Sequence, residues 1–222
     1  MFHPRVLPAT LLLSALAATV SVAGTIRGTV RIGASHGEQP AFRPYAGRAS
    51  SLPAPGHAVK GQLTDAVLWL TSAPATAGAD SGTVAAPRLA QQRQMFEPRV
   101  VVVPVGGSVS FPNLDPIYHN VFSVSPTKRF DLGKYPRGQS RTVRFEKPGV
   151  VNVYCDIHTD MAAFIVVTPS RAWARPGADG RYELRGLPAG RYHLVWWHPD
   201  ARGGEADVDV PAEGEATWDV NF

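Results

Sequence analysis

One stretch of the chain, residues 151–167, constrains the fold more than any other, and its sequence is VNVYCDIHTDMAAFIVV. It begins as an apolar strand, breaks into a short polar loop at 155–161, and resumes as a second apolar run. The loop places a thiol, an imidazole and a thioether at the spacing C-x2-H-x2-M, on Cys155, His158 and Met161. Sulfur donors are soft and imidazole is borderline, so this combination favours copper over magnesium or calcium.

A second imidazole lies upstream, at His119 in the segment FPNLDPIYHNVF (111–122), at the head of another predicted strand. Taken singly, a cysteine is usually a small buried hydrophobe and a methionine fills gaps in a core. The residues are more informative as a set, because Cys155 is the only cysteine and lies three residues from His158 and six from Met161. The sequence therefore predicts one copper ion, cycling between Cu+ and Cu2+, on His119, Cys155, His158 and Met161.

These two segments resemble the copper-binding ends of cupredoxins, and the short C-x2-H-x2-M loop is most similar to that of amicyanin. The resemblance implies a type 1 (blue) copper site in which the thioether of Met161 is a weak axial donor. It also implies that Asn120, which follows His119, ties the two ligand-bearing loops together through its side chain. The alternative is a turn asparagine that is present for its backbone conformation.

Taken whole, the chain resembles bacterial proteins described as methylamine utilization proteins or as plastocyanin-like, with a carboxypeptidase-regulatory-like module beside the cupredoxin. The segment DGRYELRGLPAGRYHLVWWHP (179–199) carries the second resemblance, with DG and PAG turns bounding short alternating strands. Two earlier segments, TIRGTVRI (25–32) and AVLWL (66–70), match the first strands of such modules. The methylamine label implies no particular substrate.

We expect an all-β chain, because Gly and Pro are frequent (21 and 20 residues), valine-rich runs recur, and no long 3.6-residue periodicity is present. A Greek-key cupredoxin β-sandwich should occupy 91–168. A small transthyretin-like, carboxypeptidase-regulatory-like β-sandwich should be built from 24–75 and 171–222, with the cupredoxin inserted between its halves. Two independent flanking pieces are the alternative.

The first 23 residues have the pattern of a secretory signal peptide. His3 and Arg5 give a weakly positive start, 7–22 is apolar, and small residues precede Gly24. The sequence therefore predicts export to the periplasm. A membrane anchor is the alternative, but polar residues interrupt the apolar stretch, and no later stretch approaches the roughly 20 apolar residues that span a bilayer.

Other features exclude some classes of function. A net charge of +4 is too small to indicate nucleic-acid binding, and no RNA-binding aromatic motif is present. His36 and His57 lie in a Gly- and Pro-rich segment, and His193 and His198 lie beside tryptophans. We expect none of these four to bind metal, because no second ligand lies at a recognisable spacing from them.

The function expected is that of a one-electron carrier, with another periplasmic redox protein as its partner. No G-x-S-x-G elbow or H-E-x-x-H helix occurs, so we do not expect an enzyme. The loop differs from that of amicyanin, which has prolines beside its second histidine, whereas Ile157 and Thr159 flank His158 here. Asp156 and Asp160 add two carboxylates nearby; their charge would favour Cu2+, or one of them would ligate. Two alternatives stay open: a copper-sensing, copper-delivering or red-copper-like protein, and a non-redox binding module.

Charge is distributed unevenly along the chain. Positive residues gather in 128–147, where only Asp131 and Glu146 oppose them: Lys128, Arg129, Lys134, Arg137, Arg141, Arg144 and Lys147. The segment 200–219 is acidic. This asymmetry predicts that the cupredoxin steers an acidic redox partner. The alternatives are that both runs are solvated strand faces, or that they face each other across the domain boundary.

Overall fold

The computed structural model describes residues 23–33, 62–74, 77, 87–212 and 214–222. The predicted signal peptide, except for its last residue, lies outside the described residues, as do His36 and His57. Within the described ranges, no helix is long and apolar enough to cross a membrane. Apart from one short 3-10 turn, η1 (Leu63–Asp65), every regular element is a strand, so the all-β prediction is confirmed.

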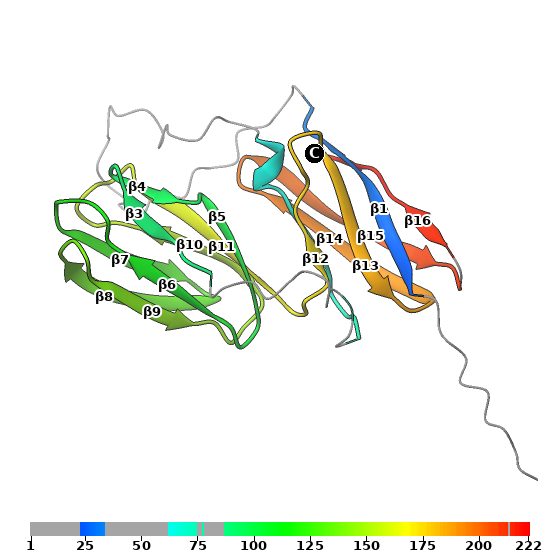
Figure 1. Ribbon diagram of the computed structural model, residues 1–222, viewed down its shortest axis with the longest axis horizontal. Coiled ribbons are helices and arrows are strands. Elements are labelled where there is room, and N and C mark those ends of the chain that lie inside the picture. The colour runs from blue at the N-terminus through cyan, green and yellow to red at the C-terminus, as the bar shows by residue number, and fades with distance from the viewer. Residues whose placement is uncertain (1–22, 34–61, 75–76, 78–86, 213) are drawn as a thin grey trace, which may run out of the picture.

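The middle of the chain forms a first sandwich (Figure 1). Its strands are β3 (Ala90–Gln92), β4 (Met95–Glu97), β5 (Val100–Pro104), β6 (Ser108–Pro112), β7 (His119–Ser125), β8 (Lys128–Tyr135), β9 (Ser140–Arg144), β10 (Gly149–Tyr154) and β11 (Ala162–Thr168). A five-stranded sheet has the order β5-β11-β10-β7-β8, while β6 pairs with β9 and β3 pairs with β4. Between the sheets lies one apolar core, to which both Cys155 and Met161 belong.

The remaining strands form a second sandwich: β1 (Gly24–Arg31), β2 (Val67–Leu70), β12 (Trp173–Ala174), β13 (Arg181–Leu187), β14 (Gly190–His198), β15 (Ala201–Val210), β16 (Glu215–Thr217) and β17 (Val220–Asn221). β1 pairs with β13, β16 and β17, and β2 pairs with β12 and β14. Strands that precede the first sandwich in sequence therefore share sheets with strands that follow it. The identity of this sandwich as a carboxypeptidase-regulatory-like module stays a prediction.

A Gly-Gly turn, Gly106-Gly107, follows the valine run of β5, but it does not form a hairpin. Gly106 has a φ of 85°, a conformation that residues with a side chain rarely adopt. On either side of it, β5 pairs in parallel with β11, and β6 pairs with β9. The turn therefore carries the chain from one sheet of the sandwich to the other.

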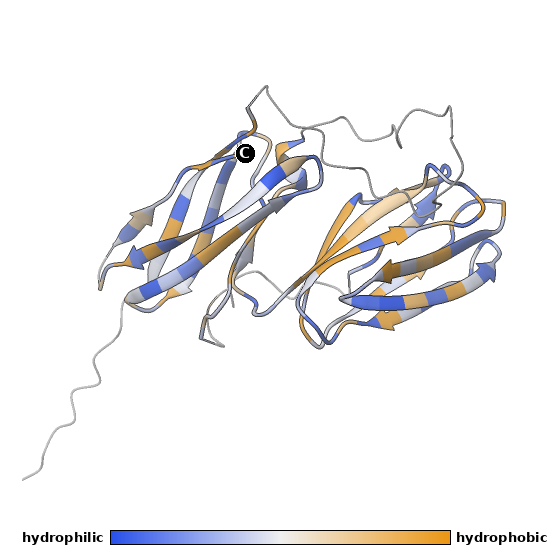
Figure 2. Cartoon of the chain, turned by 180° about the vertical axis from the view of Figure 1, so that it is seen from behind, coloured by the Kyte–Doolittle hydropathy of each residue, from blue (hydrophilic) through white to orange (hydrophobic). Residues whose placement is uncertain are grey.

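The two sandwiches pack against each other through β5. Val101 and Val103 point into the first core, while Val100 and Val102 belong to a separate cluster between the sandwiches. That cluster also contains Val67, Val166, Trp69, Phe164, Trp173 and Trp197. A strand buried on both faces is apolar throughout, whereas a strand with one solvated face alternates. Figure 2 shows this contrast, with nearly continuous hydrophobic colour on the first-sandwich strands nearest the second sandwich.

Candidate metal centre

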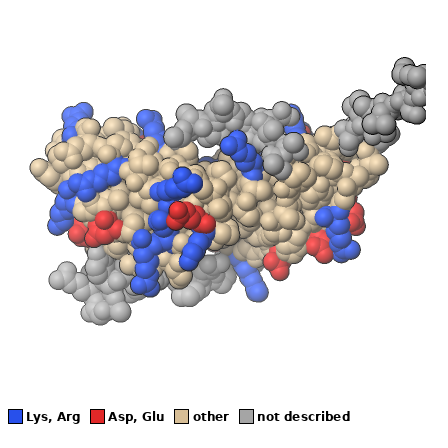
Figure 3. All heavy atoms as spheres, turned by 90° about the horizontal axis from the view of Figure 1, so that it is seen from below, with Lys and Arg blue, Asp and Glu red and all other residues tan. Residues whose placement is uncertain are grey.

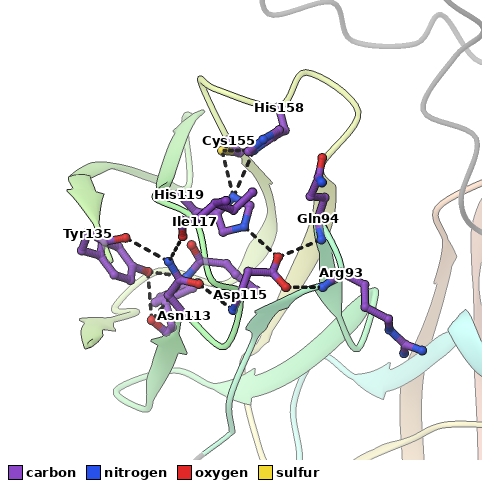
Figure 4. A network of polar contacts seen from close by, with 11 residues as sticks. Arg93, Gln94, Asn113, Asp115, Ile117, His119, Tyr135, Cys155 and His158 are labelled. Carbon is purple, nitrogen blue, oxygen red and sulfur yellow. Dashed lines mark hydrogen bonds and ion pairs between the residues drawn. The ribbon is translucent and has the colours of Figure 1, made fainter. Parts of the chain in front are cut away.

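Three of the four predicted ligands meet at one end of the first sandwich (Figure 4). His119 is the first residue of β7, and Cys155 directly follows the last residue of β10. His158 lies in the loop that leads from β10 to β11. The imidazole of His119 and the thiol are fully buried, whereas His158 is partly exposed.

The donor atoms converge on a single point. His119 Nδ1 lies 3.1 Å from His158 Nδ1, and Cys155 Sγ lies 3.9 Å and 4.0 Å from these two nitrogens. Three donors bound to one ion at roughly 2.0–2.3 Å lie about 3–4 Å from one another, so the spacing fits a single metal ion. Two imidazoles and one thiolate are a set that suits copper. Among the described residues, this is the group of His, Cys, Asp and Glu side chains that could hold a metal.

Asp115 orients the ring of His119, a role that the sequence did not reveal. Its Oδ2 lies 2.8 Å from His119 Nε2, so this nitrogen carries the proton and donates it to the carboxylate. The other nitrogen, Nδ1, then presents its lone pair to Cys155 and His158. This tautomer is the one that binds a metal, and the carboxylate also makes the imidazole a stronger donor.

The Asp115 carboxylate is itself held by backbone groups of the β3–β4 turn. The backbone N–H groups of Arg93 and Gln94 donate to its two oxygens at 2.5 Å and 2.8 Å. Burial alone would raise the pKa of Asp115, but the hydrogen bonds from Gln94, His119 and Arg93 outweigh burial and lower it. The carboxylate is therefore charged at neutral pH.

Asn113 fixes the loop between β6 and β7. Its side-chain oxygen accepts the backbone N–H of Asp115 at 2.9 Å, and its Nδ2 donates to the carbonyl oxygens of Ile117 and Tyr135, both at 2.9 Å. These bonds join the loop to the end of β8, beside His119. The ligand-bearing segment 113–119 is thus tied to the sheet from both sides.

His158 is the ligand nearest to solvent. Burial lowers its pKa, and the neighbouring His119 lowers it further, while Asp115 acts in the opposite direction. A shallow pocket of about 410 Å³ lies beside the ring, lined by Arg93, Gln94, Ile157, His158, Thr159 and Asp160. The ring edge of His158 is therefore the part of the cluster that solvent reaches.

The structure buries Met161 in the same core as Cys155. Its backbone N–H donates to the carbonyl of His158 at 3.0 Å, which closes the loop, and its role as axial ligand stays a prediction. Asn120 is also buried, and its Nδ2 donates to Asp131 on β8 at 2.7 Å. Among the described residues, its Oδ1 has no hydrogen-bond partner, and the predicted tie between the ligand loops stays a prediction.

The other sequence candidates lie apart from this cluster. Asp156 and Asp160 are exposed, and neither belongs to the group of three donors. Asp156 instead lies 3.8 Å from Lys134 on β8. His193 and His198 are on β14 in the second sandwich, as the sequence indicated.

No protein-family model matches this chain, and no curated protein matches it. Among solved structures, it is similar to the Cu-containing nitrite reductase (NirK) from Thermus scotoductus SA-01, with 26% identity over 37% of this chain and 22% of that chain and a TM-score of 0.36. It is also similar to a purple cupredoxin from Nitrosopumilus maritimus (22% identity, 37% and 99% coverage, TM-score 0.34) and to a methionine-to-alanine mutant of amicyanin in the Cu(I) form (22%, 45% and 97%, TM-score 0.35).

The chain thus spans about a fifth of the length of the nitrite reductase. TM-scores near 0.35 are low, so we infer nothing about this chain from these similarities. The description of its metal centre rests on its own geometry. Strands β3 to β11 form a sandwich that gathers two imidazoles and one thiol at one end. Two imidazoles and one thiol at one end of a β-sandwich are a donor set suited to copper.

Proposed function

We propose that this protein is a periplasmic type 1 copper protein that carries single electrons between redox partners. The observation that supports the proposal most strongly is the convergence of His119 Nδ1, Cys155 Sγ and His158 Nδ1 within 4.0 Å of one another. Copper bound there would supply one-electron chemistry by cycling between Cu+ and Cu2+. The methylamine-utilization type and the regulatory-like second module belong to the same proposal.

The residues of the chain keep the donor positions constant. His119 and Cys155 are attached to β7 and β10, which lie side by side in one sheet, and the His158 carbonyl is bonded to the Met161 N–H. Asp115 holds the His119 ring in one tautomer. A site whose ligands move little between oxidation states has little structure to rearrange when an electron leaves, and this favours rapid transfer over catalysis.

The direct test is the absorption and electron paramagnetic resonance spectrum of the copper-loaded full chain. A thiolate-to-copper charge-transfer band with the narrow hyperfine splitting of a type 1 site would support the proposal. Met161→Leu should keep that band and raise the reduction potential, because the thioether is a weak axial donor to Cu2+. A copper-loaded chain without the band would contradict the proposal.

A copper-delivering or red-copper-like protein is the second candidate, favoured by the pocket beside His158. The pocket gives solvent access to this ligand and includes the carboxylate-bearing Asp160. A ligand that solvent reaches is more readily exchanged with a partner protein. Transfer of copper to a metal-free acceptor peptide in seconds, together with a red-shifted or absent blue band, would favour this candidate over the electron carrier.

A further inference from the structure

The basic residues of 128–147 form a surface over β8 and β9 that the described residues neutralise only in part. Lys134, Arg137, Arg141 and Arg144 are all exposed there. Within the described chain, the ion pair found on this face is Lys134 with Asp156, at 3.8 Å. Figure 3 shows Lys and Arg gathered over this part of the molecule. In the second sandwich, by contrast, Arg27, Arg185 and Arg191 each pair with a carboxylate: Glu215, Glu183 and Asp207.

One end of this face adjoins the metal centre. Lys134 is paired with Asn120 in the sheet, next to the ligand His119. The Arg141 guanidinium lies 5.0 Å from the centre of the Tyr135 ring, and Tyr135 is the sheet partner of His119.

Arg137 lies in the connection between β8 and β9, and the same connection is bonded to the β6–β7 loop. Gly138 N–H donates to Asn113 O at 2.8 Å, and Asn113 N–H donates to Gln139 O at 2.9 Å. Asn113 leads into the segment that carries His119. We call Lys134, Arg137 and Arg141 the cationic arc, and it borders the ligand-bearing loops.

The acidic segment 200–219 of the second sandwich lies too far from the arc to neutralise it. The five-stranded sheet places β5, which contacts the second sandwich, at one edge and β8 at the other. Four strand spacings of about 4.8 Å separate them, roughly 19 Å in all. That distance is about twice the Debye length of roughly 8 Å at physiological ionic strength, so charges on the two sides are screened from each other.

An apolar rim lies beside the arc. Among the residues that the structure describes, six large hydrophobic side chains are exposed, and four of them are on the two ligand-bearing loops: Leu114, Ile117, Tyr118 and Ile157. They surround the end of the sandwich from which the His158 edge is reached. A surface with an apolar centre and charge at its border is typical of a transient protein interface.

We infer that the apolar rim and the cationic arc together form the docking surface for an acidic redox protein, whose carboxylates face Lys134, Arg137 and Arg141. This inference rests on the proposed electron-carrier function and names the class of partner. The apolar contact brings the partner over His158, and the arc raises the rate of encounter. Electrostatic steering of this kind raises association rates by about 10- to 1,000-fold and weakens with salt.

The first experiment does not depend on copper. The metal-free full chain is titrated with poly-L-glutamate, and backbone amide shifts are followed by NMR. We expect the shifts to concentrate in 114–118, 134–141 and 157–158. Shifts spread over the second sandwich, or none at all, would overturn the inference, and so would tighter binding of this surface to duplex DNA or to phosphatidylglycerol vesicles.

The second experiment measures oxidation of the copper(I) chain by hexacyanoferrate(III), a trianion. The double variant Lys134→Glu with Arg137→Glu should slow it by roughly tenfold at low ionic strength and by much less at 1 M salt, where the Debye length is about 3 Å. The control is the double variant Arg129→Glu with Lys147→Glu, which lowers the net charge by the same amount at the far end of the basic face. Arg129 lies about 17 Å from Lys134 along β8. Its effect should be clearly smaller.

Equal slowing in both double variants would show that only net charge matters and would overturn the arc. Failure of the proposed function gives a different result. A chain that shows no blue copper band but whose amide shifts still concentrate at the arc and rim would keep the docking surface and reject the electron carrier.

Discussion

The histidines of the two sandwiches differ in the partners of their ring nitrogens. In the second sandwich, His198 Nε2 donates to Gln62 O at 3.0 Å, and its Nδ1 accepts the Asp200 N–H at 3.0 Å. Both nitrogens of His193 face carboxylates, Asp207 at 2.8 Å and Glu205 at 3.4 Å. Every ring nitrogen there has a complementary partner in the protein.

In the first sandwich, the Nδ1 atoms of His119 and His158 face each other and a thiol. The Nε2–H of His119 donates a hydrogen bond to Asp115, so its Nδ1 is an acceptor, and it faces the Nδ1 of His158 and the thiol of Cys155. A proton on the thiol or on His158 Nδ1 can satisfy only some of the lone pairs in this cluster, whereas one cation would be shared by all three donors. The ring nitrogens of His198 and His193 are thus satisfied by fixed partners in the second sandwich, whereas the Nδ1 atoms of His119 and His158 converge with a thiol on one point that could hold a metal ion.

The largest effect that tests this comparison should come from Cys155→Ser. An alcohol is a much poorer ligand for copper than a thiolate, so the charge-transfer band should disappear completely. Copper should also lose most of its stabilising effect on the chain, which for a ligand at 1,000 times its Kd is about 4 kcal/mol. Absorption spectra and melting curves with and without copper measure both changes.

His198→Gln is the matched control, because it changes a buried histidine of the other sandwich. Copper binding and the band should be unchanged in it, although the melting temperature falls. A blue band that survives in Cys155→Ser, or one that is lost in His198→Gln, would break the distinction between the two sandwiches.

A second prediction concerns the contact that joins the sandwiches. Arg99 lies 2.7 Å from Asp200 and 3.3 Å from Asp65, with its side chain only 22% exposed. Arg99→Met leaves both carboxylates without this guanidinium, and we expect the chain to lose about 2–4 kcal/mol of unfolding free energy, near the lower range for broken buried pairs. Denaturant unfolding measures the loss, and the copper spectrum should not change.

The comparison for Arg99 is Arg185, whose pair with Glu183 is exposed. Arg185→Gln should lower the unfolding free energy by no more than about 1 kcal/mol, as is usual for surface pairs. Equal losses in the two variants would show that the junction between the sandwiches contributes no more than a surface ion pair.

The proximity of Cys155 and His158 was predictable from sequence, because they lie three residues apart in one short loop, where spacing alone shows that the side chains are near one another. The role of Met161, in the same loop, stays a prediction. The strand pattern also predicted β1, β2, β7, β10 and β11 to within a few residues, since alternating or continuous apolar runs carry that signal.

What the sequence did not show depends on contacts between distant segments. Asp115 becomes a partner of His119 only because the β3–β4 turn brings two backbone N–H groups onto its carboxylate. A carboxylate four residues before a ligand histidine is the signal that could have found it. Arg99 and Asp200 are 101 residues apart, and no local pattern indicates their pairing.

A third prediction compares two carboxylate–histidine pairs, both 2.8 Å long, one in each sandwich. Asp115→Asn keeps an acceptor for the His119 N–H but removes the charge. We expect copper affinity to fall by roughly 10- to 100-fold. The reduction potential should rise, because a nearby negative charge stabilises Cu2+ more than Cu+.

The matched control for Asp115 is Asp207→Asn, which makes the same change beside His193. Copper affinity and potential should not respond to it. If Asp115→Asn leaves both quantities at their wild-type values, the carboxylate only shapes the loop and does not act on the metal through His119.

The smallest effect should be a pH dependence of opposite sign at the two histidines of the second sandwich. Burial lowers the pKa of His198, and Arg99 lowers it too, while the Gln62 carbonyl, Asp200 and Asp65 raise it by less. As the pH falls, His198 is therefore protonated at a higher pH in the unfolded chain than in the folded chain. The stability that depends on neutral His198 is full above its ordinary pKa of about 6.5 and is lost as the pH falls toward the folded pKa.

For His193 the sign reverses, because hydrogen bonds to Asp207 and then Glu205 raise its pKa. Its contribution is full below about pH 6.5 and is lost as the pH rises through the folded pKa. Because this histidine is at the surface, solvent screening keeps the effect small. Melting temperatures of the metal-free chain, His198→Gln and His193→Gln between pH 5 and 8 test both. The difference in melting temperature between wild type and His198→Gln should grow with pH, whereas the difference between wild type and His193→Gln should shrink. Parallel curves would show that neither histidine has a different pKa in the folded and unfolded chains.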